Sequence, residues 1–150
     1  MKILVDADAC PVKEIVVKIA KKNGISVTMI LDTAHVYNDG YSQVLTVDKG
    51  VDSVDFTLMG LVQTGDVVVT QDYGLAAMAL SKNAKVINQN GLIYTTQNID
   101  QLLMNRYLCA KARKARIRTK GPSKRTKNDD LKFELAFEQL LSLSCENDHL

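Results

Sequence analysis

Residues 3–11, ILVDADACP, decide how the chain begins to fold. Three apolar residues predict a short buried strand, which ends abruptly in Asp6, with a second carboxylate, Asp8, two positions later. Pro11 suits the first turn of a helix, and apolar residues then recur at helical spacing over 12–19. The stretch therefore predicts a strand followed at once by a helix, with two acids at the junction.

The same alternation of short apolar runs and helical patterns continues to about residue 94. The predicted strands cover residues 2–5, 25–31, 44–47, 67–69, 85–88 and, as a short addition, 92–94. The predicted helices cover residues 11–23, 52–63 and 75–82. Because continuously apolar strands are buried on both faces, the pattern predicts a three-layer α/β/α sandwich around a central, mainly parallel sheet of about five strands.

Residues 101–150 are predicted to extend this α/β core of residues 1–100 within a single domain, since 150 residues is a common domain size. The extension is predicted to contain a basic helix over residues 99–117 and a loop around Gly121-Pro122. A C-terminal helix is predicted to start at Asp129-Asp130, and the tail from Ser144 is predicted to be frayed.

The cysteines and the hydropathy pattern bear on the cellular location of the protein. Cys10, Cys109 and Cys145 are far apart and lack a CxxC pattern, which argues against a disulfide framework or a zinc ribbon. No signal peptide is visible, and no apolar run approaches the ~18 residues of a membrane span. We therefore expect a cytoplasmic protein without membrane contact. The oligomeric state stays open, a homodimer included.

Acidic residues follow several of the predicted strands. Asp6 ends the first strand, Asp48 follows the third, and Asp72 follows the fourth. Asp52 and Asp55 lie three residues apart in the first turn of a predicted helix and therefore share one of its faces. Because the carboxyl ends of parallel strands meet at one edge of a sheet, where ligands bind, these acids are expected to converge.

Carboxylates that lie close together repel one another unless a cation lies between them. Mg²⁺ and Mn²⁺ prefer oxygen ligands, and such ions can activate water for the displacement at a phosphoryl group. The sequence therefore predicts a Mg²⁺ or Mn²⁺ site, with one or two ions. Its predicted ligands are Asp6, Asp55 and Asp72, assisted by Asp8 and Asp52.

Each of these acids also has a purely structural interpretation. Asp8 precedes a helix and either caps it or acts as a second carboxylate of the site. Asp52 and Asp55 would favour the positive end of the helix dipole whatever the function. Asp72 is also interpretable as a turn residue, whereas Asp6 directly ends a buried strand and is harder to explain in this way.

A basic strip, Met104 to Lys127, holds ten of the 19 Lys and Arg residues and none of the 17 acids. Such a strip suits contact with nucleic-acid phosphates, and the alternative is a solvated surface. Six phosphate contacts would lower affinity on the order of 10³-fold between 50 and 200 mM salt. The predicted nucleic-acid contacts are Arg113, Lys114, Arg116, Arg118, Lys120, Lys124 and Arg125. Lys13, one turn into the first helix, is either solvated or faces a phosphate.

Four stretches, ILVDADACPVK (3–13), VDKGVDSVD (47–55), GDVVVTQDYGLA (65–76) and KGPSKRTKNDDLKF (120–133), resemble the YaiI/YqxD family of small bacterial proteins. That family is similar to the PIN-like superfamily. The resemblance covers nearly the whole chain and implies a central parallel sheet between helices. It also implies a Mg²⁺- or Mn²⁺-dependent ribonuclease that uses an acidic cluster.

The resemblance assigns roles to particular residues. Asp6 matches the acid at the end of the first strand, and Asp55 matches the acid that opens a helix. Thr70 and Asp72 match a T-x-D pattern, in which Thr70 is the hydroxyl member. PIN nucleases usually carry a Glu on an intervening helix, but Glu14 is the only Glu before residue 134. Asp8 or Asp52 would have to substitute for it.

Three functions remain as hypotheses from the sequence. The first is a metal-dependent phosphodiester hydrolase, a ribonuclease, in which the acidic cluster holds the ion and activates water. The second is a small phosphatase with Asp6 as nucleophile and Asp8 as general acid, because DAD also resembles the opening of haloacid-dehalogenase-type phosphatases. The third is a non-catalytic nucleic-acid-binding or regulatory protein.

Overall fold

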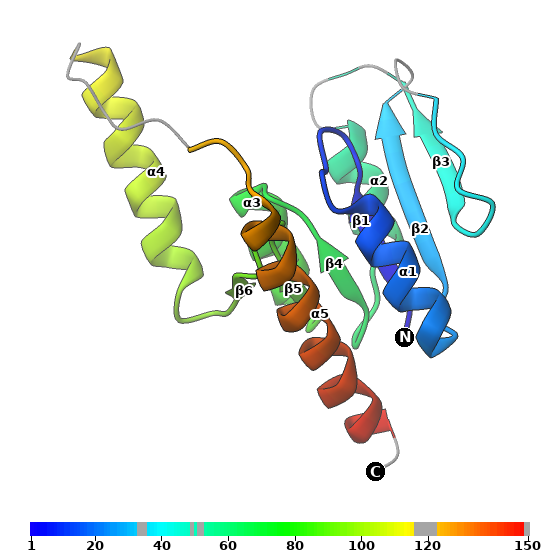
Figure 1. Cartoon of the computed structure of the whole chain (residues 1–150). Helices are drawn as coiled ribbons and strands as arrows, with labels where there is room; N and C mark the ends of the chain where they lie inside the picture. The colour runs from blue at the N-terminus through cyan, green and yellow to red at the C-terminus, as the bar shows by residue number, and fades with distance from the viewer. Residues whose placement is uncertain (33–35, 49, 51–52, 116–122, 149–150) are drawn as a thin grey trace.

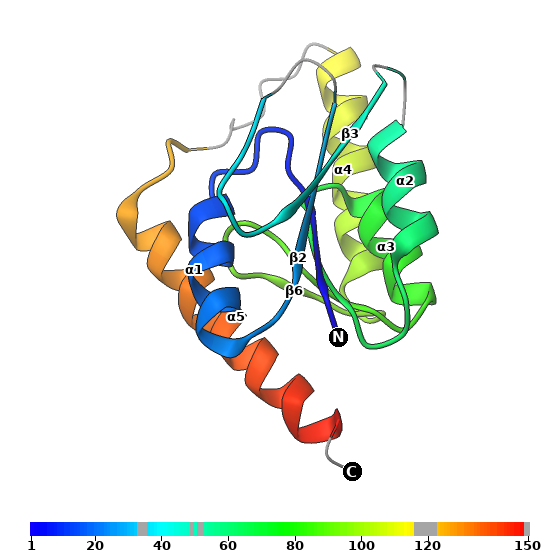
Figure 2. The same cartoon turned by 90° about the vertical axis from the view of Figure 1, so that its right-hand side faces the viewer.

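The computed structural model describes residues 1–32, 36–48, 50, 53–115 and 123–148. Within them, six strands form one sheet between two layers of helices (Figure 1). The strands are β1 (Ile3–Asp6), β2 (Val27–Asp32), β3 (Gln43–Val47), β4 (Val67–Val69), β5 (Lys85–Ile87) and β6 (Ile93–Tyr94). The helices are α1 (Lys13–Asn23), α2 (Ser53–Leu61), α3 (Tyr73–Ser81), α4 (Ile99–Lys114) and α5 (Lys127–Asp148). Figure 2 shows α1 and α5 on one side of the sheet and α2, α3 and α4 on the other, which confirms the predicted α/β sandwich.

The order of the strands across the sheet is β3-β2-β1-β4-β5-β6. The first five in this order are parallel to their neighbours, and β6 at the edge pairs antiparallel with β5. The chain builds outward from β1 to β3 and then crosses back to place β4 on the other side of β1. The carboxyl ends of β1 and β4 therefore form the topological switch point, where open α/β sheets bind ligands.

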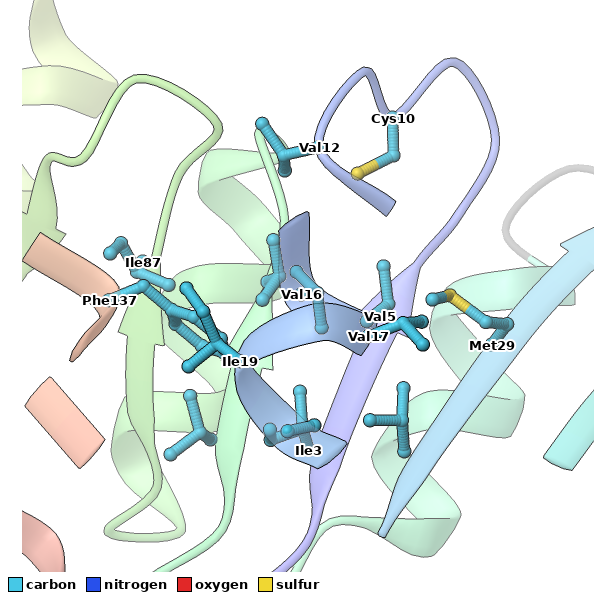
Figure 3. Packing of buried hydrophobic residues seen from close by; sticks show 14 of the residues in the cluster. Ile3, Val5, Cys10, Val12, Val16, Val17, Ile19, Met29, Ile87 and Phe137 are labelled. Carbon is cyan, nitrogen blue, oxygen red and sulfur yellow. The ribbon is translucent and has the colours of Figure 1, made fainter. Parts of the chain in front are cut away.

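The two faces of the sheet have separate apolar cores because side chains alternate along each strand. Ile3 and Val5 belong to the core under α1 and α5, whereas Leu4 belongs to the core under α2 and α3. Figure 3 shows part of the first core, in which side chains of β1, α1 and α5 gather. Both faces are covered, which is why the strands are continuously apolar in sequence.

The first core is closed by α5. Phe133 and Phe137 are fully buried, and their rings stack with centroids 5.2 Å apart. Farther along the helix, Ser144 is 5% exposed, and its hydroxyl accepts a hydrogen bond of 2.7 Å from the Lys85 ammonium. The prediction that the chain frays from Ser144 is therefore wrong. The same hydroxyl donates to the Leu140 carbonyl at 2.8 Å, so this buried polar group is paired both within α5 and with Lys85, 59 positions away in the sequence.

Two helices begin two residues earlier than predicted because a side chain caps each of them. α3 begins at Tyr73, where Asp72 accepts hydrogen bonds from the backbone of the first turn. α5 begins at Lys127, because the Asp129 carboxylate accepts from the Thr126 N–H at 2.9 Å and the Asp129 N–H donates back to the Thr126 hydroxyl at 3.4 Å. This reciprocal pair is a capping box.

The basic helix is shorter than predicted. α4 ends at Lys114, with Ala115 as its C-cap, and the predicted last residues 116 and 117 lie outside the described part of the chain. Among the described residues, no helix combines the length and the apolar composition needed to cross a membrane.

Gly91 holds the turn between β5 and β6 against α5, and we predict that Gly91→Ala destabilises the protein. Its φ is +87°, and a Cβ atom there would lie 2.7 Å from the Lys132 carbonyl oxygen. The backbone conformation alone should cost about 1–2 kcal/mol, and the contact with α5 should add to that loss. Gly65→Ala is the matched control, because Gly65 has a φ of +88° with no atom within 4 Å of its Cβ position. If both variants lost the same free energy of unfolding in urea, the close approach of Gly91 to α5 would be contradicted.

Candidate functional site

Asp6, Thr70 and Asp72 are linked across the switch point. The Thr70 hydroxyl donates to Asp6 Oδ2 at 2.9 Å and accepts from the Asp72 N–H at 3.0 Å. Thr70 is 3% exposed, so its hydroxyl is an internal bridge between the end of β1 and the segment after β4. Through this bridge, the T-x-D pattern holds the Asp6 carboxylate in place.

Asp72 has a structural role as well as a place in the site. Its Oδ1 atom accepts from the N–H groups of Gly74 at 2.9 Å and Leu75 at 3.2 Å, which caps α3. Among the described residues, Oδ2 receives no hydrogen bond. The cap fixes the carboxylate at the N-terminus of α3, where the helix dipole favours its negative charge. The structural and the functional interpretation of Asp72 are therefore compatible.

Asp8 is not the N-cap of the first helix. The N-cap position of α1 is Val12, which makes no side-chain cap hydrogen bond. Instead, the two oxygens of Asp8 lie 3.2 and 3.4 Å from the backbone nitrogen of Asp32, at the end of β2. The next residue, Ala9, has a φ of +55°, a conformation that residues other than glycine adopt rarely and that often occurs at functional sites. The capping hypothesis for Asp8 is wrong because β2 supplies its hydrogen-bond donor.

An acidic hollow of about 220 Å³ opens at this edge of the sheet. No Lys or Arg of the described residues lines it. Its lining residues are Asp8, Asp32, Asp48, Gly50, Ser53, Val54, Asp55 and Asp72. The structure thus brings together three of the five predicted ligands, Asp8, Asp55 and Asp72. Asp6 borders a separate small cavity with Cys10 and Thr70.

Sequence reasoning missed two of the acids in the hollow. Asp32 lies just beyond the predicted strand of residues 25–31, although in the structure it ends β2 just as Asp6 ends β1. Asp48 was noted after the third strand but was not included among the predicted ligands. The signal that identified Asp6, an acid directly at a strand end, applies to both of them. Asp52, in contrast, lies outside the described residues.

The acids influence one another electrostatically. The pKa of Asp6 is raised from 3.8 to about 6. Burial is the largest cause, the charges of Asp55, Asp72 and Asp8 add to it, and the hydrogen bond from Thr70 opposes it. A partly buried carboxylate beside three others is costly to ionise without a cation. Asp6 is therefore coupled electrostatically to three of the other four acids predicted as ligands.

The donor atoms of the site suit a hard divalent cation, because they are carboxylate oxygens. Within the described part of the chain, however, no three Asp, Glu, His or Cys side chains are arranged to hold one metal ion. Binding of an ion would therefore require these side chains to close around it. A cation bound there would relieve the repulsion from Asp55, Asp72 and Asp8, which adds to the effect of burial on the pKa of Asp6.

The predicted phosphate contacts are placed in different ways. Lys13 lies over the Tyr37 ring, with its ammonium 5.0 Å from the ring centroid, a cation–π contact. Arg125 donates to Asp130, to the Gln89 carbonyl and to Asn90, and so joins the start of α5 to the turn after β5. The other described contacts are exposed, namely Arg113, Lys114 and Lys124. Arg116, Arg118 and Lys120 lie outside the described residues.

The basic end of α4 and the acidic hollow lie on the same side of the molecule. In Figures 1 and 2 the C-terminal end of α4, in yellow, lies on the side toward which the carboxyl ends of the strands point. Arg106, on the same helix, borders a hollow together with Gln71, Asp72 and Tyr73. A cationic surface therefore adjoins the carboxylate cluster.

The fold and the site define an α/β protein with a carboxylate cluster at the switch point of a mainly parallel sheet. The chain belongs to the YaiI/YqxD family, because a family model described as "Uncharacterized BCR, YaiI/YqxD family" matches residues 4–143. A UPF0178 protein of Ruminiclostridium cellulolyticum is 62% identical over 91% of this chain and 89% of its own. UPF0178 protein CA_C2825 of Clostridium acetobutylicum is 52% identical over 94% and 97%. No solved structure matches the chain significantly.

Proposed function

We propose that the protein is a Mg²⁺- or Mn²⁺-dependent phosphodiester hydrolase that acts on RNA. The observation that carries this proposal is the acidic hollow in which Asp8, Asp55 and Asp72 come together, with Asp6 close enough to feel their charges. Carboxylates that lie this close together repel one another, and a divalent cation with oxygen ligands would neutralise that repulsion. The cationic surface of α4 beside it supports a polyanionic substrate.

In this proposal Asp6, Asp55 and Asp72 hold the ion, and Asp8 and Asp52 assist them. The ion, when bound, supplies positive charge against the phosphate and lowers the pKa of water. Thr70 keeps the Asp6 carboxylate oriented through its 2.9 Å hydrogen bond, and the cap on α3 keeps Asp72 fixed. Arg106 is positioned to attract the substrate backbone next to the acids.

We predict that Mn²⁺ stabilises the folded protein against urea by about 2.7 kcal/mol at a hundredfold excess over its Kd. Asp55→Asn should abolish this gain and also the Mn²⁺-dependent cleavage of a single-stranded RNA. Asp100→Asn, at an exposed acid of α4 away from the hollow, should retain both. Absence of a Mn²⁺ effect on the wild-type protein would disprove the metal site, and a gain in stability without cleavage would disprove the hydrolase.

A non-catalytic nucleic-acid-binding function is the second candidate. It is favoured by the exposure of Arg113, Lys114 and Lys124 together with the lack of a ready metal arrangement among the described side chains. This alternative predicts RNA binding that weakens with salt but does not respond to Mn²⁺ or to Asp6→Asn. The same variants and titrations therefore distinguish the two functions.

A further inference from the structure

A larger, apolar groove adjoins the acidic hollow. Its volume is about 730 Å³, within the range of about 300–1,000 Å³ that is usual for sites of small ligands. Asp55 and Asp72 line both the acidic hollow and this groove. The remaining wall is largely apolar, with Phe56 and Met59 from α2 and Met78 from α3. A ligand in the groove would therefore reach directly to the two carboxylates.

Phe56 is unusual among the apolar residues of the groove. It follows Asp55 on α2 and is 85% exposed, whereas Leu58, two residues later, is fully buried in the core. The fold therefore does not need the Phe56 ring for packing. Met78, from the neighbouring helix, is also 42% exposed, so an aromatic ring and a polarisable thioether line the same groove. Exposed apolar groups that gather in a hollow indicate a binding surface.

The charges around the groove indicate what kind of molecule binds there. Arg106 of α4 also lines the groove and is exposed. Arg113 lies two helical turns farther along, so it shares a face of α4 with Arg106, and this face leads toward the carboxyl edge of the sheet (Figure 1). A molecule with flat rings joined by anionic groups would fit this surface, with a ring against Phe56 and the anionic groups near Arg106 and Arg113.

We infer that the apolar groove binds an unpaired base of a single-stranded nucleic acid, with one face of the base against Phe56 and the backbone phosphates near Arg106 and Arg113. The inference rests on the proposed function, since it places the adjoining phosphate at Asp55 and Asp72. A single strand is required because the faces of bases in a duplex are covered by their stacked neighbours. Stacking on an aromatic side chain tolerates any base, so the groove selects strandedness over sequence.

The absence of tryptophan from the chain allows a direct test. Phe56→Trp introduces a single indole into the groove, and a short single-stranded oligonucleotide should quench its fluorescence to saturation. Leu135→Trp is the matched control, because Leu135 is 68% exposed on α5, in the opposite helical layer. Its fluorescence should not respond. Equal quenching of both variants, or of neither, would overturn the inference.

The affinity for nucleic acid provides a second test. Fluorescence anisotropy would measure the Kd for labelled single strands of RNA and of DNA and for the same RNA in a duplex. Phe56→Ala should weaken single-strand binding roughly 5- to 150-fold. It should leave urea unfolding unchanged, because the ring is exposed. Arg106→Ala should weaken binding and lower the slope of log K against log salt by about one. Unchanged affinity of Phe56→Ala, or equally tight binding of the duplex, would overturn the inference.

Failure of the groove and failure of the proposed function give different results. Binding that depends on Phe56, without Mn²⁺-dependent cleavage by the wild-type protein, supports the groove and disproves the hydrolase. Cleavage with unchanged affinity and KM in Phe56→Ala supports the hydrolase and overturns the groove. A change from dimer to monomer in Phe56→Ala, with unchanged oligonucleotide affinity, would assign the groove to a second copy of the chain and also overturn the inference.

Discussion

Replacing Asp6 by asparagine is expected to stabilise the cation-free protein by on the order of 3 kcal/mol at about pH 8. In the folded protein, burial and, to a smaller extent, the charges of Asp55, Asp72 and Asp8 raise the pKa of Asp6 to about 6. The ionised carboxylate is therefore less favourable in the folded state than in the unfolded chain. Asparagine removes this charge but retains an oxygen that accepts the hydrogen bond from Thr70.

The expected gain from Asp6→Asn depends on pH in a defined direction. Below the ordinary pKa of 3.8, Asp6 is protonated in both states and the charge adds no cost. Between 3.8 and about 6 the folded state binds more protons than the unfolded state, so the wild-type protein loses stability as the pH rises. Asp6→Asn lacks this loss. The difference between the two proteins should therefore grow across this interval and stay constant above it.

Urea unfolding in the presence of a chelator, repeated over a series of pH values, measures this difference. Asp100→Asn is the control, because Asp100 is an exposed acid in the first turn of α4, and its loss should destabilise the protein by less than about 1 kcal/mol. Mn²⁺ should nearly cancel this difference at a hundredfold excess over its Kd and reverse it at about a thousandfold excess, where the gain is about 4.1 kcal/mol, since it stabilises the wild-type protein but not Asp6→Asn. A loss of stability in Asp6→Asn, or a gain that does not vary with pH, would contradict the prediction.

Replacing Phe137 by alanine is expected to destabilise the protein by about 3–5 kcal/mol, which is the usual cost of removing a buried phenylalanine. Phe137 has no exposed surface and stacks against Phe133 at 5.2 Å. Figure 3 shows it beside Ile87 of β5 and Ile19 of α1, so one ring joins three elements of the fold. Its removal would leave a cavity that these elements cannot easily fill.

The control for this prediction lies on the same helix. Leu135 is 68% exposed, so Leu135→Ala should change the free energy of unfolding by less than about 0.5 kcal/mol. Phe137→Leu, which keeps most of the apolar volume, should lie between the two. Urea unfolding with a common m value measures all three. Equal effects of Phe137→Ala and Leu135→Ala would show that α5 does not contribute to the core as described.

Much of the fold could be predicted from local patterns. The apolar runs at residues 3–5 and 67–69 identified buried strands, because a strand covered on both faces has no polar side to alternate. The spacing of apolar residues identified each helix. The bounds were less accurate, since capping by Asp72 and by Thr126 with Asp129 decides where α3 and α5 begin. The burial of Ser144 was not predicted, because its hydroxyl is paired both with the Leu140 carbonyl of the same helix and with Lys85, a contact that only the packed chain provides.

The sequence by itself determined the alternating α/β architecture and the presence of Asp6, Asp55 and Asp72 at one edge, because strand ends follow directly from the apolar pattern. Only the tertiary structure decided how these acids are held. Asp6 bonds to Thr70, 64 positions away, and Asp8 to the backbone of Asp32, 24 positions away. Such partners depend on which strands become neighbours. The order of the sheet, which places β4 beside β1, is a property of the packed chain and is not contained in any local stretch.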